Sequence, residues 1–233
     1  MNVLLAAVDS SAAAQPVLDV AQELARLLGT EVETVHVPEP NEPDVVRTVH
    51  ALVEERDAAG LVVGARGAPG GASPAGHVTT ELVQTLDVPV AVVPPQARPR
   101  PIQRVLVGVE GNGESPALQR VVANLRGSSL EIVALHVFEP DRLPLFGDQP
   151  VLETEAWADE FERRALRGTT GTVRTEARVG VPPHAIRRAA AELDSDLVVV
   201  AWHRALHGGH GRVVRGLLED ADVPVLLIPL ATR

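Results

Sequence analysis

The residues of this 233-residue chain that are best suited to hold a ligand form a glycine-rich segment after a short apolar run. The run Leu61-Val62-Val63 leads into Gly64-Ala65-Arg66-Gly67, and Gly70, Gly71 and Gly76 follow before His77-Val78-Thr79. A glycine-rich loop exposes backbone N–H groups, and a helix N-terminus adds a partial positive charge, so this segment suits phosphate if it joins a strand to a helix. Arg66 can add a charge-assisted hydrogen bond to the same anion.

A second candidate ligand residue, Asp9, directly follows the apolar run Val3–Val8. In doubly wound sheets, ligands bind at the carboxyl ends of the strands, where the strand order reverses. We therefore expect Asp9 and the glycine-rich segment to lie at the same edge of a sheet. Asp9 can also cap the helix that follows it, and the two roles do not exclude each other.

The elements that must position these residues are short apolar runs that alternate with helical patterns. In the first half, strands are predicted over 3–8, 31–37, 61–63 and the Val-Pro-Val segment 88–93, with helices near 17–28, 44–53 and 78–86. Continuously apolar strands are typical of parallel sheets that are covered on both faces. The alternation predicts βαβ units and an α/β fold.

The same arrangement occurs twice along the chain. Three segments recur in order: 3–9 and 105–110, 33–40 and 133–140, and 87–94 and 222–229. Between the copies, Pro94–Pro101 contains four prolines in eight residues and favours an extended linker. We predict a first domain over 1–94, a Pro-rich linker over 95–101 and a second domain over 102–233. The second domain should hold a long helix near Glu153–Arg167 and a strand over Thr172–Val179 that the shortened first domain lacks.

With these motifs, the chain resembles the universal stress protein family, in a tandem two-domain form that covers nearly its whole length. The resemblance implies two tandem Rossmann-like domains of the adenine nucleotide alpha hydrolase type, each with a parallel sheet flanked by helices. One branch of the family binds ATP through Gly-x-x-Gly, nine residues, and then Gly-Ser or Gly-Thr. By that pattern Asp9 and Val37 would lie towards adenosine, Val63, Gly64, Arg66 and Gly67 along the ribose and phosphates, and Gly76, His77, Val78 and Thr79 at the phosphates.

Both halves depart from the family's motif. In the first half, eight residues separate Gly67 from Gly76, and His77 stands in place of the hydroxyl residue. In the second half, Ala201-Trp202-His203-Arg204 replaces Gly-x-x-Gly, so a Cβ obstructs the close approach of a phosphate to the backbone. The first half is therefore the expected nucleotide site, and the second half is a degenerate domain retained for packing.

Composition excludes several chemistries. The chain has no cysteine, and all 21 of its basic Lys and Arg side chains are arginines, so thiolate and lysine chemistry are absent. A net charge of −10 disfavours nucleic acid and anionic membranes as partners. His203, His207 and His210 fit a solvated loop better than a metal site. Arg204, Arg212 and Arg215 form either an anion site or a solvated face.

The function expected from the sequence is a non-enzymatic, stress-linked regulator that binds ATP, ADP or AMP in its first half, with Mg²⁺ as an option and no other cofactor. The alternative is a nucleotide-free interaction module in which both sites have decayed, and a weak ATPase is a third reading. We expect a cytoplasmic protein without a signal peptide or membrane span. The resemblance implies that the Val-Pro-Val edge strands of the two domains pair, giving a pseudo-dimeric monomer, with a homodimer as the other arrangement.

Overall fold

The computed structural model describes residues 3–10, 14–37, 45–65, 75–98, 100–109, 124–125, 130–139, 172–205 and 211–230 of the chain, and all structural statements below concern these residues. The first half of the molecule contains strands β1 (Val3–Val8), β2 (Glu31–His36), β3 (Gly60–Gly64) and β4 (Val90–Val93), with helices α1 (Ala14–Leu28), α2 (Val45–Glu55) and α3 (His77–Thr85). The second half contains β5 (Arg104–Val109), β6 (Glu131–Phe138), β7 (Thr172–Val179), β8 (Leu197–Trp202) and β9 (Val225–Pro229), with helices α6 (Pro182–Glu192) and α7 (Arg212–Asp220).

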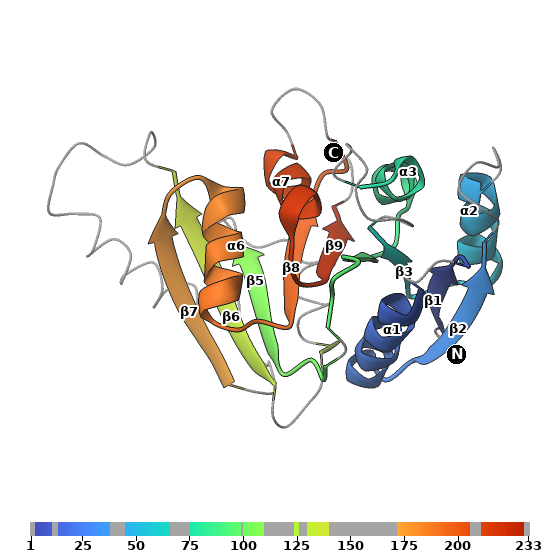
Figure 1. The fold of residues 1–233 in the computed structure, drawn as a ribbon, viewed down its shortest axis with the longest axis horizontal. Helices are drawn as coiled ribbons and strands as arrows, with labels where there is room; N and C mark the ends of the chain where they lie inside the picture. Colours follow the sequence, from blue (N-terminus) through green and yellow to red (C-terminus); the bar gives the residue numbers. More distant parts are fainter. Residues whose placement is uncertain are drawn as a thin grey trace, which may run out of the picture.

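All nine of these strands belong to one sheet, in the order β2-β1-β3-β4-β9-β8-β5-β6-β7 (Figure 1). The central pair, β4 and β9, is antiparallel, with Ala91 opposite Leu226. Every other neighbouring pair is parallel. The strands that end the two halves therefore lie side by side, and the parallel sets extend outwards from them in opposite directions.

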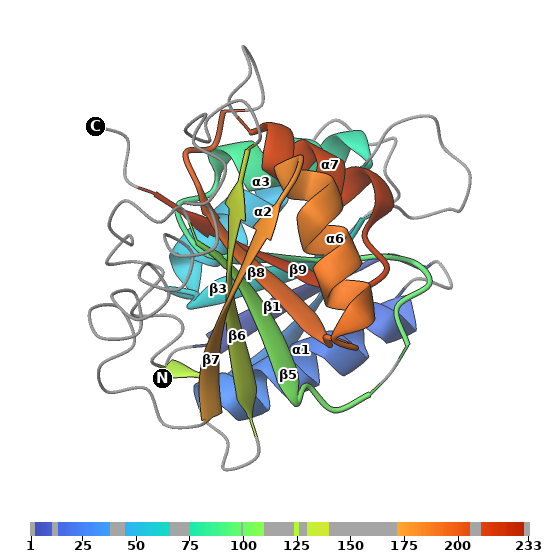
Figure 2. The same cartoon turned by 90° about the vertical axis from the view of Figure 1, so that its left-hand side faces the viewer.

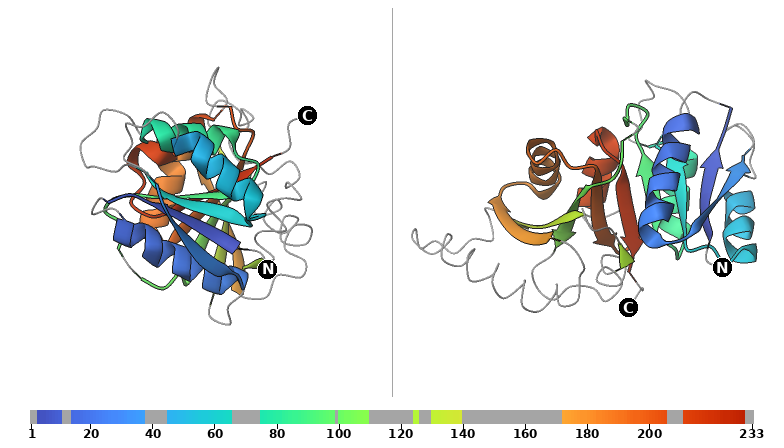
Figure 3. Two further views of the ribbon diagram at one scale, coloured as in Figure 1. Left: turned by 90° about the vertical axis from the view of Figure 1, so that its right-hand side faces the viewer. Right: turned by 90° about the horizontal axis from the view of Figure 1, so that it is seen from below.

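Helices cover both faces of the sheet, as Figures 2 and 3 show. The apolar residues of α2, α3, α6 and α7 form one buried cluster with one face of the strands. Those of α1 form a second cluster with the other face. Because strands covered on both faces must be apolar throughout, β4 and most of β1, β8 and β9 are fully buried.

The predicted elements agree with this arrangement. α1 ends at Leu28, and Gly29 adopts φ +67°, the left-handed conformation that suits glycine at the end of a helix. The strand predicted over Thr172–Val179 is β7, the edge strand of the second half. The long helix predicted near Glu153–Arg167 lies outside the described residues. The structure thus confirms the α/β class and the strand predicted over Thr172–Val179.

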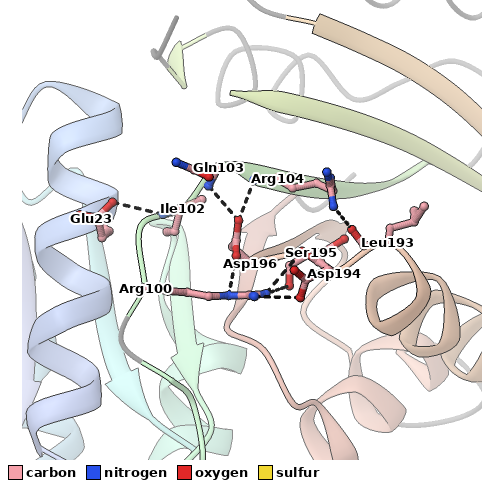
Figure 4. Close-up of polar contacts among 9 residues, drawn as sticks. All are labelled: Glu23, Arg100, Ile102, Gln103, Arg104, Leu193, Asp194, Ser195 and Asp196. Atoms are coloured by element: carbon pink, nitrogen blue, oxygen red, sulfur yellow. Dashed lines mark hydrogen bonds and ion pairs between the residues drawn. The ribbon is translucent and has the colours of Figure 1, made fainter. Parts of the chain in front are cut away.

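The segment between the halves is bonded to both of them (Figure 4). The Arg100 guanidinium lies 2.5 Å from a carboxylate oxygen of Asp196 and donates to the Ser195 carbonyl at 2.8 Å. Asp196, whose side chain is 8% exposed, also accepts the backbone N–H groups of Gln103 and Arg104, both at 2.8 Å. On the other side, the Ile102 N–H reaches the Glu23 carboxylate of α1 at 3.2 Å. The end of the linker, at Arg100, and the residues that follow it as far as Arg104 are therefore fixed against both halves.

Candidate functional site

The predicted ligand residues of the first half meet at the carboxyl edge of the sheet. β1 lies between β2 and β3, so the strand order reverses between β1 and β3, where α/β sheets bind ligands. Asp9 follows β1, Gly64 ends β3, and Ala7 pairs with Val63 across the two strands. Beyond β2, the Val37 N–H donates to the Val8 carbonyl at 2.9 Å, which holds Val37 against the end of β1.

The N-terminus of α3 is attached to the end of β3 at the same edge. The Gly76 N–H donates to the Ala65 carbonyl at 2.8 Å. The Thr79 hydroxyl donates to the Gly64 carbonyl, also at 2.8 Å, and Thr79 is only 7% exposed. Because this hydroxyl is already bonded within the protein, Thr79 can offer a ligand its backbone N–H but not its side chain. The bond of its hydroxyl to Gly64 is a structural role that the sequence did not indicate.

The first turn of α3 presents backbone donors towards this edge. Gly76 precedes the helix with φ −56° and ψ 155°, and no described side chain caps the N-terminus. The N–H groups of His77, Val78 and Thr79 belong to the first turn, which has no intrahelical carbonyl partners. The Thr80 N–H is the first to bond within the helix, to the Gly76 carbonyl at 2.9 Å. Such a helix end attracts anions because its donors and its dipole point the same way.

The His77 side chain lies on the surface at the start of this helix. It is 89% exposed, and its Nδ1 is 3.5 Å from a carboxylate oxygen of Glu81, one turn along α3. The imidazole is therefore free to turn towards a ligand, but it shares this position with a negative charge. Arg66 and Gly67, predicted to follow the phosphates, lie outside the described residues.

The corresponding edge of the second half carries larger side chains. Trp202, at the end of β8, is 5% exposed and belongs to the buried cluster that includes Val214 of α7. Arg204 follows with φ +59°, a left-handed conformation that is unusual for a side chain other than glycine. This edge matches the first half in its backbone plan but carries bulk where the first half has glycine.

Two of the three arginines considered as an anion site already contact carboxylates. The Arg204 guanidinium forms an ion pair with Asp87, which lies between α3 and β4 in the other half. Arg212, the first residue of α7, lies 2.7 Å from Glu139, just beyond β6. These contacts neutralise much of the positive charge that an anion would need.

The histidines do not form a metal site within the described residues. No group of three or more His, Cys, Asp or Glu side chains suited to a metal ion occurs there, and His207 and His210 lie outside the described ranges. His36 and His136 hold equal positions, opposite Val8 and Val109 respectively. A ring nitrogen of His136 is 3.0 Å from the Val109 carbonyl, and its ring meets Phe138 edge to face, whereas His36 is exposed.

Comparison with known proteins places the chain in a family. The model of the universal stress protein family matches residues 101–229, more than half of the chain. The chain therefore belongs to the universal stress protein family. The family match lies in the second half and the linker, whereas the glycine-rich segment lies in the first half.

Solved structures share the fold over the whole chain. A universal stress protein from Archaeoglobus fulgidus DSM 4304 is 16% identical, with a TM-score of 0.64, and the match covers 98% of each chain. A putative universal stress protein from Pseudomonas aeruginosa UCBPP-PA14 is 13% identical, with a TM-score of 0.63, over 98% of this chain and 93% of that one. A shorter universal stress protein, solved in complex with cAMP, is 22% identical over 56% of this chain and 98% of its own, with a TM-score of 0.44.

No curated protein matches the chain. Across the described ranges, no helix has the length and apolar character required to span a membrane.

Proposed function

We propose that this protein binds an adenine nucleotide, ATP, ADP or AMP, in its first half and acts as a stress-response regulator rather than as an efficient enzyme. The observation that supports this most strongly is the N-terminus of α3, which no described side chain caps and which is fixed beside the ends of β1 and β3. Membership of the universal stress protein family is consistent with such a role. Mg²⁺ would accompany the phosphates in solution.

The position of each residue at the sheet edge determines which part of the nucleotide it would contact. Asp9 and Val37, at the ends of β1 and β2, would face adenosine. Val63 and Gly64 would follow the ribose towards the phosphates, joined by Arg66 and Gly67. Gly76, His77, Val78 and Thr79 would hold the phosphates, mainly through backbone N–H groups. With no lysine in the chain, backbone N–H groups and arginine would carry most of this contact.

In this proposal the molecule consists of two universal-stress-type domains, 1–94 and 102–233, joined by the linker 95–101. The antiparallel contact of β4 with β9 would then take the place of an interface between two chains. A nucleotide would bind to one domain only, because Trp202 and Arg204 occupy the corresponding edge of the other. The expected stoichiometry is one nucleotide per chain.

The second candidate function is a nucleotide-free interaction module. It is favoured by Glu81, whose carboxylate lies 3.5 Å from the His77 ring, near the position proposed for the phosphates. A negative charge at this position opposes the binding of an anion.

A matched pair of substitutions separates the two functions. Gly64 and Ala201 hold corresponding positions near the ends of β3 and β8, opposite Val93 and Ile228. Gly64→Val should abolish the rise in melting temperature that ATP, ADP or AMP with Mg²⁺ produces, whereas Ala201→Val should preserve it. Loss of the shift in Ala201→Val alone would place the ligand in the second half. No shift in the wild-type protein at millimolar nucleotide would favour the interaction module.

A further inference from the structure

A cavity of about 230 Å³ lies between α1 and the amino ends of the first-half strands. The described residues that line it come from α1, from the segments at the start of β1, β2, β3 and β4, and from the second half. They are Leu4, Leu24, Leu28, Thr30, Ala59, Gly60, Leu61, Pro89, Ala91, Asn124 and Leu226. Leu4 and Gly60 stand near the amino ends of their strands, whereas Asp9 and Gly64 lie at the carboxyl ends. The cavity is therefore separate from the proposed nucleotide site.

The floor of the cavity is apolar and buried. Leu4, Leu24, Ala91 and Leu226 are each at most 4% exposed and belong to the same buried cluster. They come from β1, α1, β4 and β9, so the floor crosses the line where β4 meets β9. A ligand on this floor would contact both halves of the molecule.

The outer part of the cavity is more polar but carries no charge on any described side chain. Leu28, Thr30, Ala59 and Pro89 are half-buried, and Asn124 is exposed. The Thr30 hydroxyl is buried and has no hydrogen-bond partner. Asn124 offers an amide that can both donate and accept.

The polar groups of the cavity lie in its outer part, and two backbone groups near the floor are already paired. The Pro89 carbonyl already accepts the Leu61 N–H at 2.9 Å, and the Ala59 N–H donates to the Val3 carbonyl at 2.8 Å. Buried water needs two to four polar partners, and apolar cavities without them take up apolar molecules instead. Because protein interiors are otherwise close-packed, a space of this size lined by leucines is suited to a ligand.

We propose that this cavity binds a small, uncharged, mostly apolar molecule of the class of short aliphatic or monocyclic aromatic alcohols. An engineered cavity of about 150 Å³ in another protein holds benzene, which has six non-hydrogen atoms. A cavity about 1.5 times as large therefore holds about nine non-hydrogen atoms. The apolar part of the ligand would lie on the leucine floor, and its hydroxyl would point towards Asn124. Carboxylates and phosphates are excluded, because no described lining residue would pair with their charge.

The test uses benzyl alcohol as the probe and benzoate as its charged control. The full chain should bind benzyl alcohol saturably in calorimetry, with NMR shift changes centred on Leu4, Leu24 and Leu226, and should not bind benzoate. Ala91→Leu, which fills the floor, should weaken binding at least tenfold. No saturable binding of benzyl alcohol, equal binding of benzoate, or shift changes centred elsewhere would overturn the proposal.

A pair of cavity-enlarging variants tests the same site if Ala91→Leu does not fold. Leu24 and Leu27 are both on α1, both 1% exposed and in the same buried cluster, but only Leu24 lines the cavity. Leu24→Ala should enlarge the cavity and allow the larger 1-naphthylmethanol to bind, whereas Leu27→Ala should not. An identical response of the two variants to both alcohols would refute a site at this position.

Discussion

Replacing Gly76 with aspartate should stabilise the protein and abolish nucleotide binding at the same time. Gly76 precedes α3 with a φ of −56° that any residue can adopt, and among the described residues a Cβ at this position meets only the Ala65 carbonyl oxygen, at 3.7 Å. An aspartate here can accept the N–H of Val78 or Thr79 as an N-cap. It would occupy the donors that the proposal assigns to phosphate.

The two effects have opposite signs and can be estimated separately. An aspartate cap in place of glycine contributes a few tenths of a kcal/mol, and a negative charge at a helix N-terminus adds about 0.3–1 kcal/mol. The free energy of unfolding should therefore rise by about 0.5–1 kcal/mol. A carboxylate about 4 Å from a phosphate charge costs roughly 4 kcal/mol at an effective dielectric constant of about 20, so even a strongly screened repulsion should weaken binding at least tenfold.

The matched control is Val181→Asp, at the corresponding position before α6. Val181 has φ −77° and ψ 117°, is 47% exposed, and precedes a helix that no described side chain caps. The same charge is added there, about 1 kcal/mol of stability is again expected, and nucleotide affinity should not change. Urea denaturation gives the stabilities and calorimetry gives the affinities. Undiminished nucleotide binding by Gly76→Asp would refute the use of the α3 N-terminus for phosphate.

Three further predictions concern packing, pH and assembly. Gly216→Ala should lower the free energy of unfolding by about 1 kcal/mol. A Cβ there would lie 2.6 Å from Cβ of Pro183, and the overpacking cost exceeds the gain in helix propensity. A urea titration that finds the variant more stable than wild type would contradict this. The Arg100 hydrogen bond lowers the pKa of Asp194, so the stability from this pair is present above the unfolded-state pKa near 4 and is lost as pH falls through the lower folded-state pKa. Between pH 5 and pH 2, the free energy of unfolding should therefore fall less in Arg100→Gln than in wild type. An equal fall in both proteins would contradict this role of Arg100. Sedimentation equilibrium should give a monomer mass of 24.7 kDa, since β4 and β9 already pair within one chain, and a twofold mass would indicate a homodimer.

The fold could be predicted largely because its determinants are local. Continuous apolar runs identify strands buried on both faces, and Gly29 marks the end of α1 by the left-handed backbone that it adopts. The repeated Asp-Val-Pro-Val segments end in β4 and β9, which meet at the centre of the sheet. Such signals depend on residues that are close in sequence.

The contacts that define the candidate site were harder to predict because they join distant parts of the chain. The hydroxyl of Thr79 donates to Gly64, 15 residues away, and the sequence alone assigned Thr79 to the ligand. Arg204 reaches Asp87 across 117 residues, a contact that exists only because β4 lies next to β9 and β9 next to β8. Local patterns carry no information about such pairs until the strand order is known.

The linker is predictable from its sequence only as an extended segment, because its contacts join residues that are far apart in the chain. Its proline content indicated a chain that is neither helix nor strand. Its end is held by Asp196, a largely buried carboxylate that contacts Arg100 of the linker and accepts the N–H groups of Gln103 and Arg104 just beyond it. Nothing in the local sequence of the linker identifies Asp196 as the partner.

The most direct test of the central claim is the stoichiometry of nucleotide binding by the wild-type chain, measured by calorimetric titration with ATP, ADP and AMP in the presence of Mg²⁺. Binding through the first half alone predicts saturation at one nucleotide per chain. Saturation at two per chain would show that Trp202 and Arg204 do not block the second half. No heat and no saturation at millimolar nucleotide would contradict nucleotide binding altogether.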